Sequence, residues 1–286
     1  MKNSSGTLRA ACAVALIALA GCVTTTAPAQ LDPLSMNGRD GGGKPPSYPA
    51  LMKIGVTARA GGDPATALGV FRRAAELAPP GEPAPYVEIG GTLLDMGKPN
   101  EAILAYNSAL ARNPGDWPAQ RGLAIADLHT GRPEFAFVPL AKALVDGPKD
   151  PGLYVLLGVA NDMAGRHPAA QGWYREGLTL APNDPALTID LALSLALSDH
   201  LVAAVNVLGP IADAPQASPS ERQTLSLLYG LEGDRAAAAR LARVDLNEAA
   251  VEHNLAYFDS LRAMSPEARG RAILSTGSGG GHPGVL

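Results

Sequence analysis

A recurrence of 34 residues is the feature of this sequence that most restricts its fold. Alanines recur at intervals of 34 or 35 residues, at Ala67, Ala102, Ala136, Ala170, Ala204 and Ala238. A small residue stands twelve positions before each alanine, and a glycine stands five positions before it, replaced once by Asp199. Regular self-similarity of this length predicts an array of similar units, each of which stacks on its neighbours.

Each unit reads as two helices joined by a tight turn. Glycine at the turn adopts the left-handed conformation that ends a helix without steric cost, and Asp199 is among the few residue types that tolerate it. Proline follows in the first turn of the second helix, as at Pro64 and Pro99, where a missing N–H costs nothing. A bulky residue four positions after the alanine, such as Tyr174, lies on the same helix face and is expected in the core.

This pattern resembles the tetratricopeptide repeat (TPR). The resemblance implies an all-α fold, a right-handed superhelical solenoid of about six helix-turn-helix repeats over residues 48–252. The units are expected to start near residues 48, 83, 117, 151, 185 and 219. Pro210 interrupts the pattern in the fifth unit, and Pro139 predicts a kink in the third.

After the repeats, residues 251–274 are expected to form a C-terminal capping helix region that covers the last apolar face of the array. Val251 to Met264 reads as the capping helix, and Ser265 is placed to cap one more short helix. The glycine-rich residues 275–286 are expected to form a disordered tail.

Composition agrees with a helical fold and disfavours two classes of function. Hydrophobic residues make up 47% of the chain and charged residues 17%, so the chain can bury a core. Aromatic residues are only 5%, which leaves alanine and leucine to fill that core. A formal charge of −4 without a basic stripe argues against nucleic acid as a partner, and no small-molecule substrate is indicated.

The N-terminus has the pattern of an export signal. Lys2 and Arg9 precede an apolar run over residues 10–20, which is too short to span a membrane as a helix. The run ends in Leu-Ala-Gly-Cys at residues 19–22, which resembles the bacterial lipobox. Residues 1–21 are therefore expected to be cleaved as a lipoprotein signal peptide, and Cys22 is expected to carry the acyl lipid.

Residues 22–47 are rich in Thr, Ala, Pro and Gly without apolar periodicity, which predicts a flexible tether. Val23 stands where enteric lipoproteins kept at the inner membrane carry an aspartate, so the resemblance implies the periplasmic face of the outer membrane. The acyl lipid on Cys22 is the only prosthetic group expected, and no cofactor is indicated.

In TPR arrays the first helix of each unit lines the concave face at repeat positions 5, 9, 12 and 13. Those positions are mostly apolar in this sequence, which suits an amphipathic helix or an extended apolar segment as the ligand. The expected partner-binding residues are Val87, Leu94, Arg121, Ile125, Leu128, Val155, Val159, Asp162, Met163, Ile189, Leu193 and Leu197. The residues at position 9 suit packing on the neighbouring unit equally well, and the sequence leaves both interpretations open.

No constellation typical of an enzyme or a metal site stands out. The histidines are scattered, and none has a second ligand at a metal-like spacing. The sequence contains no G-x-S-x-G motif, and both cysteines, Cys12 and Cys22, lie in or next to the signal segment. We therefore expect a non-enzymatic protein.

The C-terminal part suggests a particular family. Residues 243–246 (Arg-Val-Asp-Leu), 251–258 (Val-Glu-His-Asn-Leu-Ala-Tyr-Phe) and 191–198 (Leu-Ala-Leu-Ser-Leu-Ala-Leu-Ser) resemble the TadD family. These are TPR lipoproteins of the tight-adherence (Tad, or Flp) pilus system of Gram-negative bacteria. The resemblance implies an assembly factor that acts as a pilotin-like partner of the outer-membrane secretin or on other pilus components.

Two other non-enzymatic classes use TPR lipoproteins and stay open at this point. One assists the assembly of outer-membrane β-barrels, and the other docks peptidoglycan enzymes. Residues 254–257 are the sequence feature that favours the pilus system over both. Composition and periodicity by themselves indicate only a lipid-anchored binding scaffold.

Replacing Cys22 by Ser is expected to release the folded protein from the membrane fraction. Each buried CH₂ of an acyl chain contributes about 0.8 kcal/mol to membrane binding, and the tether shares no pattern with the repeats that could replace the lipid. Fractionation of cells that express the variant measures this. A Cys22→Ser protein that still sediments with outer membranes would place the anchor elsewhere.

Overall fold

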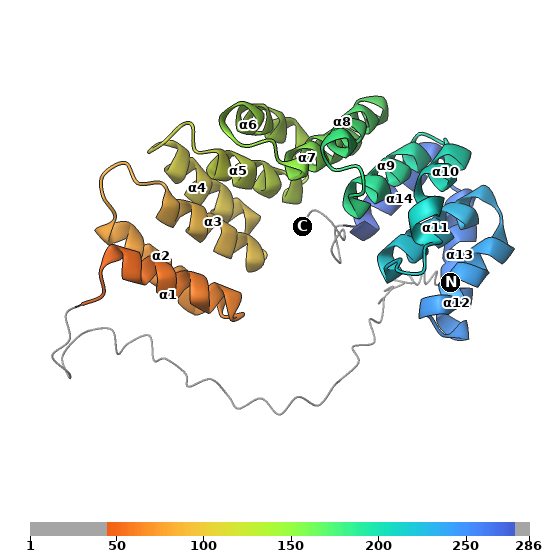
Figure 1. The fold of residues 1–286 in the computed structure, drawn as a ribbon, viewed down its shortest axis with the longest axis horizontal. Helices are drawn as coiled ribbons and strands as arrows, with labels where there is room; N and C mark the ends of the chain where they lie inside the picture. The colour runs from red at the N-terminus through yellow and green to blue at the C-terminus, as the bar shows by residue number, and fades with distance from the viewer. Residues whose placement is uncertain (1–44, 278–286) are drawn as a thin grey trace, which may run out of the picture. The chain divides into compact units, whose positions relative to one another are not determined.

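The computed structural model describes residues 45–277 of the chain. The burial of side chains is described as far as Leu274. The described residues form 14 helices and no strand, arranged as consecutive pairs (Figure 1). The all-α prediction and the repeat array are therefore confirmed. The signal peptide, Cys22, most of the tether and most of the C-terminal tail lie outside the described residues.

The pairs follow the recurrence in the sequence. The first helices of the six units are α1 (Tyr48–Ala60), α3 (Ala84–Asp95), α5 (Trp117–His129), α7 (Pro151–Met163), α9 (Pro185–Leu197) and α11 (Pro219–Glu232). The second helices are α2 (Pro64–Leu77), α4 (Pro99–Leu110), α6 (Pro133–Asp146), α8 (His167–Leu180), α10 (Leu201–Ala212) and α12 (Arg235–Asp245). Two further helices, α13 (Glu248–Arg262) and α14 (Pro266–Gly277), end the described part.

The turn inside each unit has the expected backbone. Gly62, Gly97, Gly131, Gly165 and Gly233 all have positive φ, and Asp199 takes the same conformation at φ 63°. Asp199 is the only non-glycine residue with positive φ in the described part. A left-handed conformation costs a residue that carries a Cβ roughly 1–2 kcal/mol, so the fifth unit holds a strained turn where the others do not.

Helix starts repeat with the same period as the turns. The side chains of Asp116, Asp150 and Asp184 cap α5, α7 and α9 by accepting a hydrogen bond from a backbone N–H of the first turn, at 2.9 to 3.0 Å. Ser218 caps α11 in the same way and forms a reciprocal capping box with Glu221. Each cap satisfies donors that a helix start otherwise leaves free, typically worth about 1 kcal/mol.

The two helices of a unit touch where the small residue of the first helix meets the bulky residue of the second. A Cβ added at Gly90 would lie 2.7 Å from Tyr106, and one at Gly55 or Gly158 would collide with Phe71 or Tyr174. Where the small residue is an alanine the bulky residue is a leucine, in the pairs Ala124 with Leu140 and Ala192 with Leu208, all fully buried. Glycine therefore accompanies an aromatic ring, and alanine accompanies leucine.

The prolines inside helices do not end them. Pro139 lies within α6, and α10 remains helical through Pro210. Both are second helices, and each forms the expected pair with the first helix of its unit. The kink expected at Pro139 stays a prediction.

Two helices, α13 and α14, form the region expected to cap the array. α13 packs on both α11 and α12, as the first helix of a further unit would, and Phe258 lies against Gly230. Ser265 caps α14 through its side chain, which accepts a hydrogen bond from the backbone N–H of Ala268 at 3.3 Å. α14 does not continue the stack, since it contacts α9 as well as α13.

The pairing of small and bulky residues generates a test of packing. Gly55→Ala is expected to destabilise the protein by about 1–3 kcal/mol, because the new methyl group has no room beside Phe71. Adding Phe71→Leu to Gly55→Ala should recover part of that loss, since alanine with leucine is the combination of the third and fifth units. Urea unfolding of both single variants and the double variant measures the coupling, and strictly additive effects would contradict this account of the contact.

Candidate partner-binding face

The first helices form one continuous layer of the array. Each first helix contacts the first helix of the next unit, from α1 with α3 through to α9 with α11. The second helices pack instead on the helices that precede and follow them in the chain. The layer of α1, α3, α5, α7, α9 and α11, called here the first-helix face, is therefore where side chains from successive units lie next to one another.

The structure divides the residues expected to bind a partner into two groups. Five are buried in packing between helices: Leu128, Val155, Asp162, Ile189 and Leu197. Seven are half-buried on the first-helix face: Val87, Leu94, Arg121, Ile125, Val159, Met163 and Leu193. The second group retains surface for a partner, whereas the five side chains of the first group are covered by neighbouring parts of the protein and contribute to its packing.

Two arginines on this face lie close to acidic residues of the neighbouring unit. Arg59 of α1 reaches over to α3, where it donates hydrogen bonds to Glu88 at 3.2 Å and to both carboxylate oxygens of Asp95. Gly91 makes room for this guanidinium, since a Cβ there would lie 2.8 Å from it. Arg121 of α5 lies 3.9 Å from Asp150 at the start of α7. Because these arginines lie beside carboxylates of the protein itself, the half-buried side chains left for a partner on this face are largely apolar.

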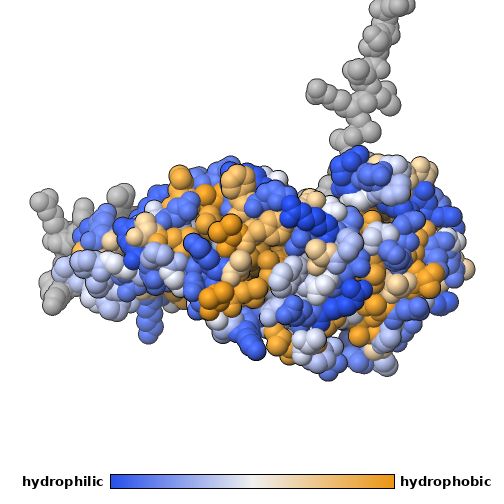
Figure 2. Space-filling view, turned by 90° about the horizontal axis from the view of Figure 1, so that it is seen from above, coloured by the Kyte–Doolittle hydropathy of each residue, from blue (hydrophilic) through white to orange (hydrophobic). Residues whose placement is uncertain are grey.

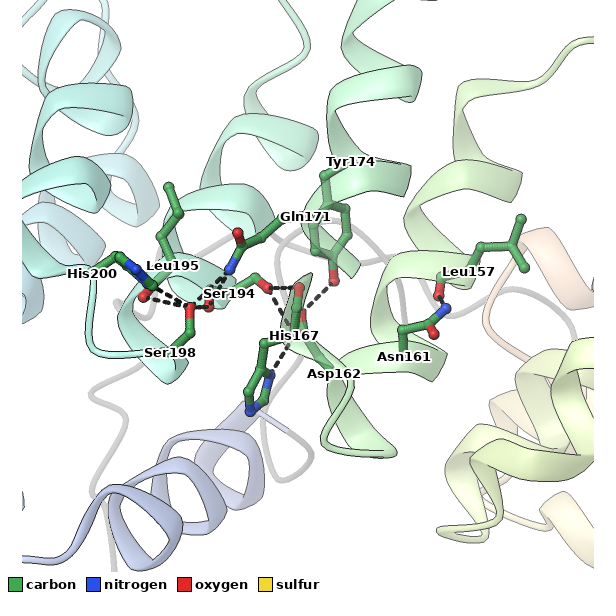
Figure 3. A network of polar contacts seen from close by, with 10 residues as sticks. All are labelled: Leu157, Asn161, Asp162, His167, Gln171, Tyr174, Ser194, Leu195, Ser198 and His200. Carbon is green, nitrogen blue, oxygen red and sulfur yellow. Dashed lines mark hydrogen bonds and ion pairs between the residues drawn. The ribbon is translucent and has the colours of Figure 1, made fainter. Parts of the chain in front are cut away.

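A buried polar network joins the fourth and fifth units (Figure 3). Asp162, near the end of α7, accepts hydrogen bonds from the Tyr174 hydroxyl at 3.0 Å and from Ser194 Oγ at 2.8 Å. Its Oδ1 also lies 2.7 Å from His167 Nδ1. These residues come from α7, α8 and α9, so a single carboxylate ties together three helices of two units.

The same network extends along α9 toward its end. Gln171 Nε2 donates to Ser198 Oγ at 2.8 Å and to the backbone oxygen of Ser194 at 3.3 Å (Figure 3). Although it contains Ser, His and Asp, the network lacks the order of a catalytic triad, because Ser194 donates directly to Asp162 and is fully buried. Its geometry is that of a structural link. The described residues also hold no cluster of three or more metal-ligating side chains.

Two groups in this region have strongly shifted pKa values. Burial raises the pKa of Tyr174 well above its ordinary value, with the charge of Asp162 acting in the same direction. The phenol therefore stays protonated and donates to Asp162. Burial, followed by the negative charges of Asp162 and Asp184, raises the pKa of Asp190 to about 8. Asp190 lies on α9 among the residues of the first-helix face, and the sequence reading did not single it out.

Apolar side chains are also exposed on a second helix, which the sequence analysis did not anticipate. Phe135, Val138 and Val145 of α6 are each more than 60% exposed. Arg132 stacks over the Phe135 ring at 5.4 Å. Hydrophobic residues come to the surface at several places in the view of Figure 2, between hydrophilic ones. The signal was the unbroken run Phe-Ala-Phe-Val at 135–138, which exceeds what one buried stripe of a helix needs.

No helix among residues 45–277 combines the length and the apolar character that crossing a bilayer requires.

The stacked helix pairs define a helical-repeat protein, and its repeat is the tetratricopeptide repeat. Two TPR family models match the chain, over residues 93–151 and 140–185. No curated protein matches it. The matched residues run from the end of α3 to the first residue of α9, so they cover most of the second to fourth pairs, where the Gly, Ala, bulky and Pro positions are most regular.

Solved TPR structures resemble the array at low sequence identity. The structure of pilF from Pseudomonas aeruginosa has a TM-score of 0.60 at 18% identity, over 73% of this chain and 97% of that one. MamA from Desulfovibrio magneticus RS-1 has a TM-score of 0.53 at 19% identity, over 57% and 92%. A chain of the APC/C hetero-tetramer Cut9–Hcn1 has a TM-score of 0.61 at 16% identity, over 74% and 43%. These similarities show the fold.

The raised pKa of Asp190 predicts how stability depends on pH. Between about pH 4 and pH 8 the unfolded chain loses the Asp190 proton while the folded protein keeps it, so the free energy of unfolding falls as pH rises. The slope from this group is at most about 1.4 kcal/mol per pH unit. Asp190→Asn should flatten the dependence measured by urea unfolding from pH 5 to pH 8.

The exposed Asp213, at the end of α10, offers a matched control. Asp213→Asn removes a carboxylate without changing the buried site, and its pH dependence should match that of the unaltered protein. If Asp190→Asn behaves like Asp213→Asn, the folded protein does not retain the Asp190 proton.

Proposed function

We propose that this protein is a membrane-anchored TPR scaffold that assists assembly of the Tad/Flp pilus apparatus, as a pilotin-like partner of the outer-membrane secretin. The observation that carries the scaffold function is the first-helix face, where half-buried apolar residues from successive units adjoin and the nearby charges are paired. A surface of this kind gains free energy by covering apolar side chains with a partner segment.

The pilus assignment is supported by the C-terminal segments that resemble the TadD family. The likeness in fold to Pseudomonas aeruginosa pilF is compatible with it. Another structure of similar fold, YrrB, at 18% identity and a TM-score of 0.50, is described as a TPR protein with an unusual peptide-binding site. Peptide binding by an array of this type is the activity we propose for the first-helix face.

The proposed location is the periplasmic face of the outer membrane, with the acyl lipid on Cys22 as anchor. Residues 22–47 would then let the array turn toward its partners while it stays near the bilayer. Protein partners, most directly the secretin or other Tad components, are proposed rather than nucleic acid or a small molecule.

Val87→Asp together with Ile125→Asp tests this function. Both residues are half-buried, and they lie on the first helices of the second and third units, at a distance along the chain from α14. A carboxylate against an apolar ligand is left desolvated and unpaired, so partner affinity should fall at least tenfold. Surface pilus yield and the amount of secretin multimer measure the effect in cells.

Arg175→Asp with Arg240→Asp is the control, since both arginines are exposed on second helices, α8 and α12. Circular dichroism and membrane fractionation should give the same result for both double variants. Normal piliation in the Val87→Asp/Ile125→Asp strain would exclude this face as the working surface. Normal piliation together with defective β-barrel assembly or cell-wall growth would favour the adaptor classes.

A further inference from the structure

The last helix of the described part folds back on the repeat array. α14 makes only slight contact with α13, the helix before it in the chain, and it also contacts α9, the first helix of the fifth unit (Figure 1). A second helix of the repeat would instead lie along its own first helix, as α8 does along α7. α14 thus occupies part of the first-helix face, where a partner segment would otherwise bind.

An ion pair fixes one end of this contact. Arg269 of α14 donates a hydrogen bond to Asp199 Oδ1 at 2.7 Å. Arg269 is only 9% exposed, whereas the side chain of Asp199 is 63% exposed. The buried guanidinium is therefore paired with a carboxylate that remains accessible from solvent.

Asp199 is also the residue that breaks the pattern of turn glycines. The equivalent position is Gly62, Gly97, Gly131, Gly165 or Gly233 in the other units, and Asp199 takes the same left-handed backbone, which is strained for a residue that carries a Cβ. Strained backbone at one residue is often associated with a specific role of that residue's side chain. In this structure the side chain holds Arg269.

Apolar contacts continue one helical turn further along α14. Ile273 is buried in the same hydrophobic cluster as Leu197 and, at its edge, Leu193. Gly270 lies over Leu197, and a Cβ at Gly270 would come to 3.4 Å from Leu197 Cδ2. The contacts of α14 thus include an arginine, a small residue beside it and a branched aliphatic residue four positions after the arginine, and Ala272 and Leu274 pack against the same cluster.

The contact is small enough to open. Of residues 266–274 only Arg269 and Ile273 are buried, whereas α13 buries Val251, Leu255, Phe258 and Leu261. A helix with so few buried side chains, near the end of the described part, belongs to the less stable parts of a fold and can open without unfolding the rest. Opening would uncover Leu197 and Leu193, two of the residues expected to bind a partner.

We propose that the surface around Asp199 and Leu197 is a helix-binding site that α14 fills in the free protein. Its external ligand is a partner helix with the same pattern, an arginine followed four residues later by a branched aliphatic side chain, which binds by displacing α14. This rests on the proposed function in that the partner is a protein. The apparent affinity for such a helix is the intrinsic affinity reduced by the fraction of molecules in which α14 is open.

Hydrogen exchange of the full chain tests whether Asp199 holds α14. Asp199→Asn keeps a residue that tolerates the left-handed turn but removes the charge, and Arg269→Gln removes the other partner. Both should speed amide exchange in residues 267–277 by about three- to tenfold, the range expected for an ion pair with one exposed member, and leave α1 to α8 unchanged. Arg271→Gln is the control, because Arg271 is exposed on the same helix.

Binding of a fluorescent peptide with the sequence of residues 264–277 tests the site itself. The peptide should bind the Arg269→Gln chain at least threefold more tightly than the unaltered chain, because α14 of that variant has left Asp199 free. It should bind Asp199→Asn more weakly than Arg269→Gln, and a peptide with Gln in place of Arg269 should lose the difference.

Equal peptide binding to the unaltered and Arg269→Gln chains, or none to either, would overturn the proposal and leave α14 as a cap. Unchanged exchange in both Asp199→Asn and Arg269→Gln would overturn it as well. These measurements use the purified chain without pilus components. Their failure therefore leaves the scaffold function standing, and a failed piliation test on α3 and α5 leaves the α14 site standing.

Discussion

The array depends on how closely the two helices of each unit approach at one small residue. Gly90 admits the ring of Tyr106 to a distance that no Cβ would allow, and Ala124 stands where the bulky partner is the smaller Leu140. This contact sets the spacing within a pair, and the pair then presents its first helix to the next unit. A larger side chain at the small residue would therefore collide first with the bulky residue of the same unit.

Polar groups inside the array have a different role, which is to fix units relative to one another. The Asp162 carboxylate is held by groups from α8 and α9, so it bonds across the junction between the fourth and fifth units. A buried carboxylate is costly unless it is hydrogen-bonded, and such a link is specific because few alternative packings satisfy it. Asp190 lies in the same region in an environment that favours its neutral form. Side-chain hydrogen bonds join other units as well, as from Arg59 to Glu88 and from Arg166 to Glu134, but those side chains are at least partly exposed, whereas Asp162 is buried.

The sequence predicted the parts of this fold that a repeated local rule determines. Turn glycines, the tolerance of Asp199 for their conformation and the cap at Ser265 all follow from backbone preferences of single residues, and the structure has them. The features that could not be predicted depend on contacts between residues far apart in the sequence. No periodic pattern in the sequence indicates the burial of Leu128 and Ile189 by neighbouring helices, the raised pKa of Asp190 or the contact of α14 with α9. The groove residues were named from repeat positions, which identify a helix face but not how much of it the next unit covers.

The contact between Asp199 and Arg269 changes the order in which this chain can come apart. A stack of repeats in which each unit touches only its neighbours can fray one unit at a time from either end. Arg59 and Asp95, which are 36 residues apart, are typical of such neighbour contacts, whereas Asp199 and Arg269 are 70 residues apart. The latter pair closes the fifth unit, the sixth unit and α13 into a loop. While α14 stays in place, the array should therefore unravel first from α1 under mechanical tension or protease attack, and unravelling from the C-terminal side should begin only after α14 is released.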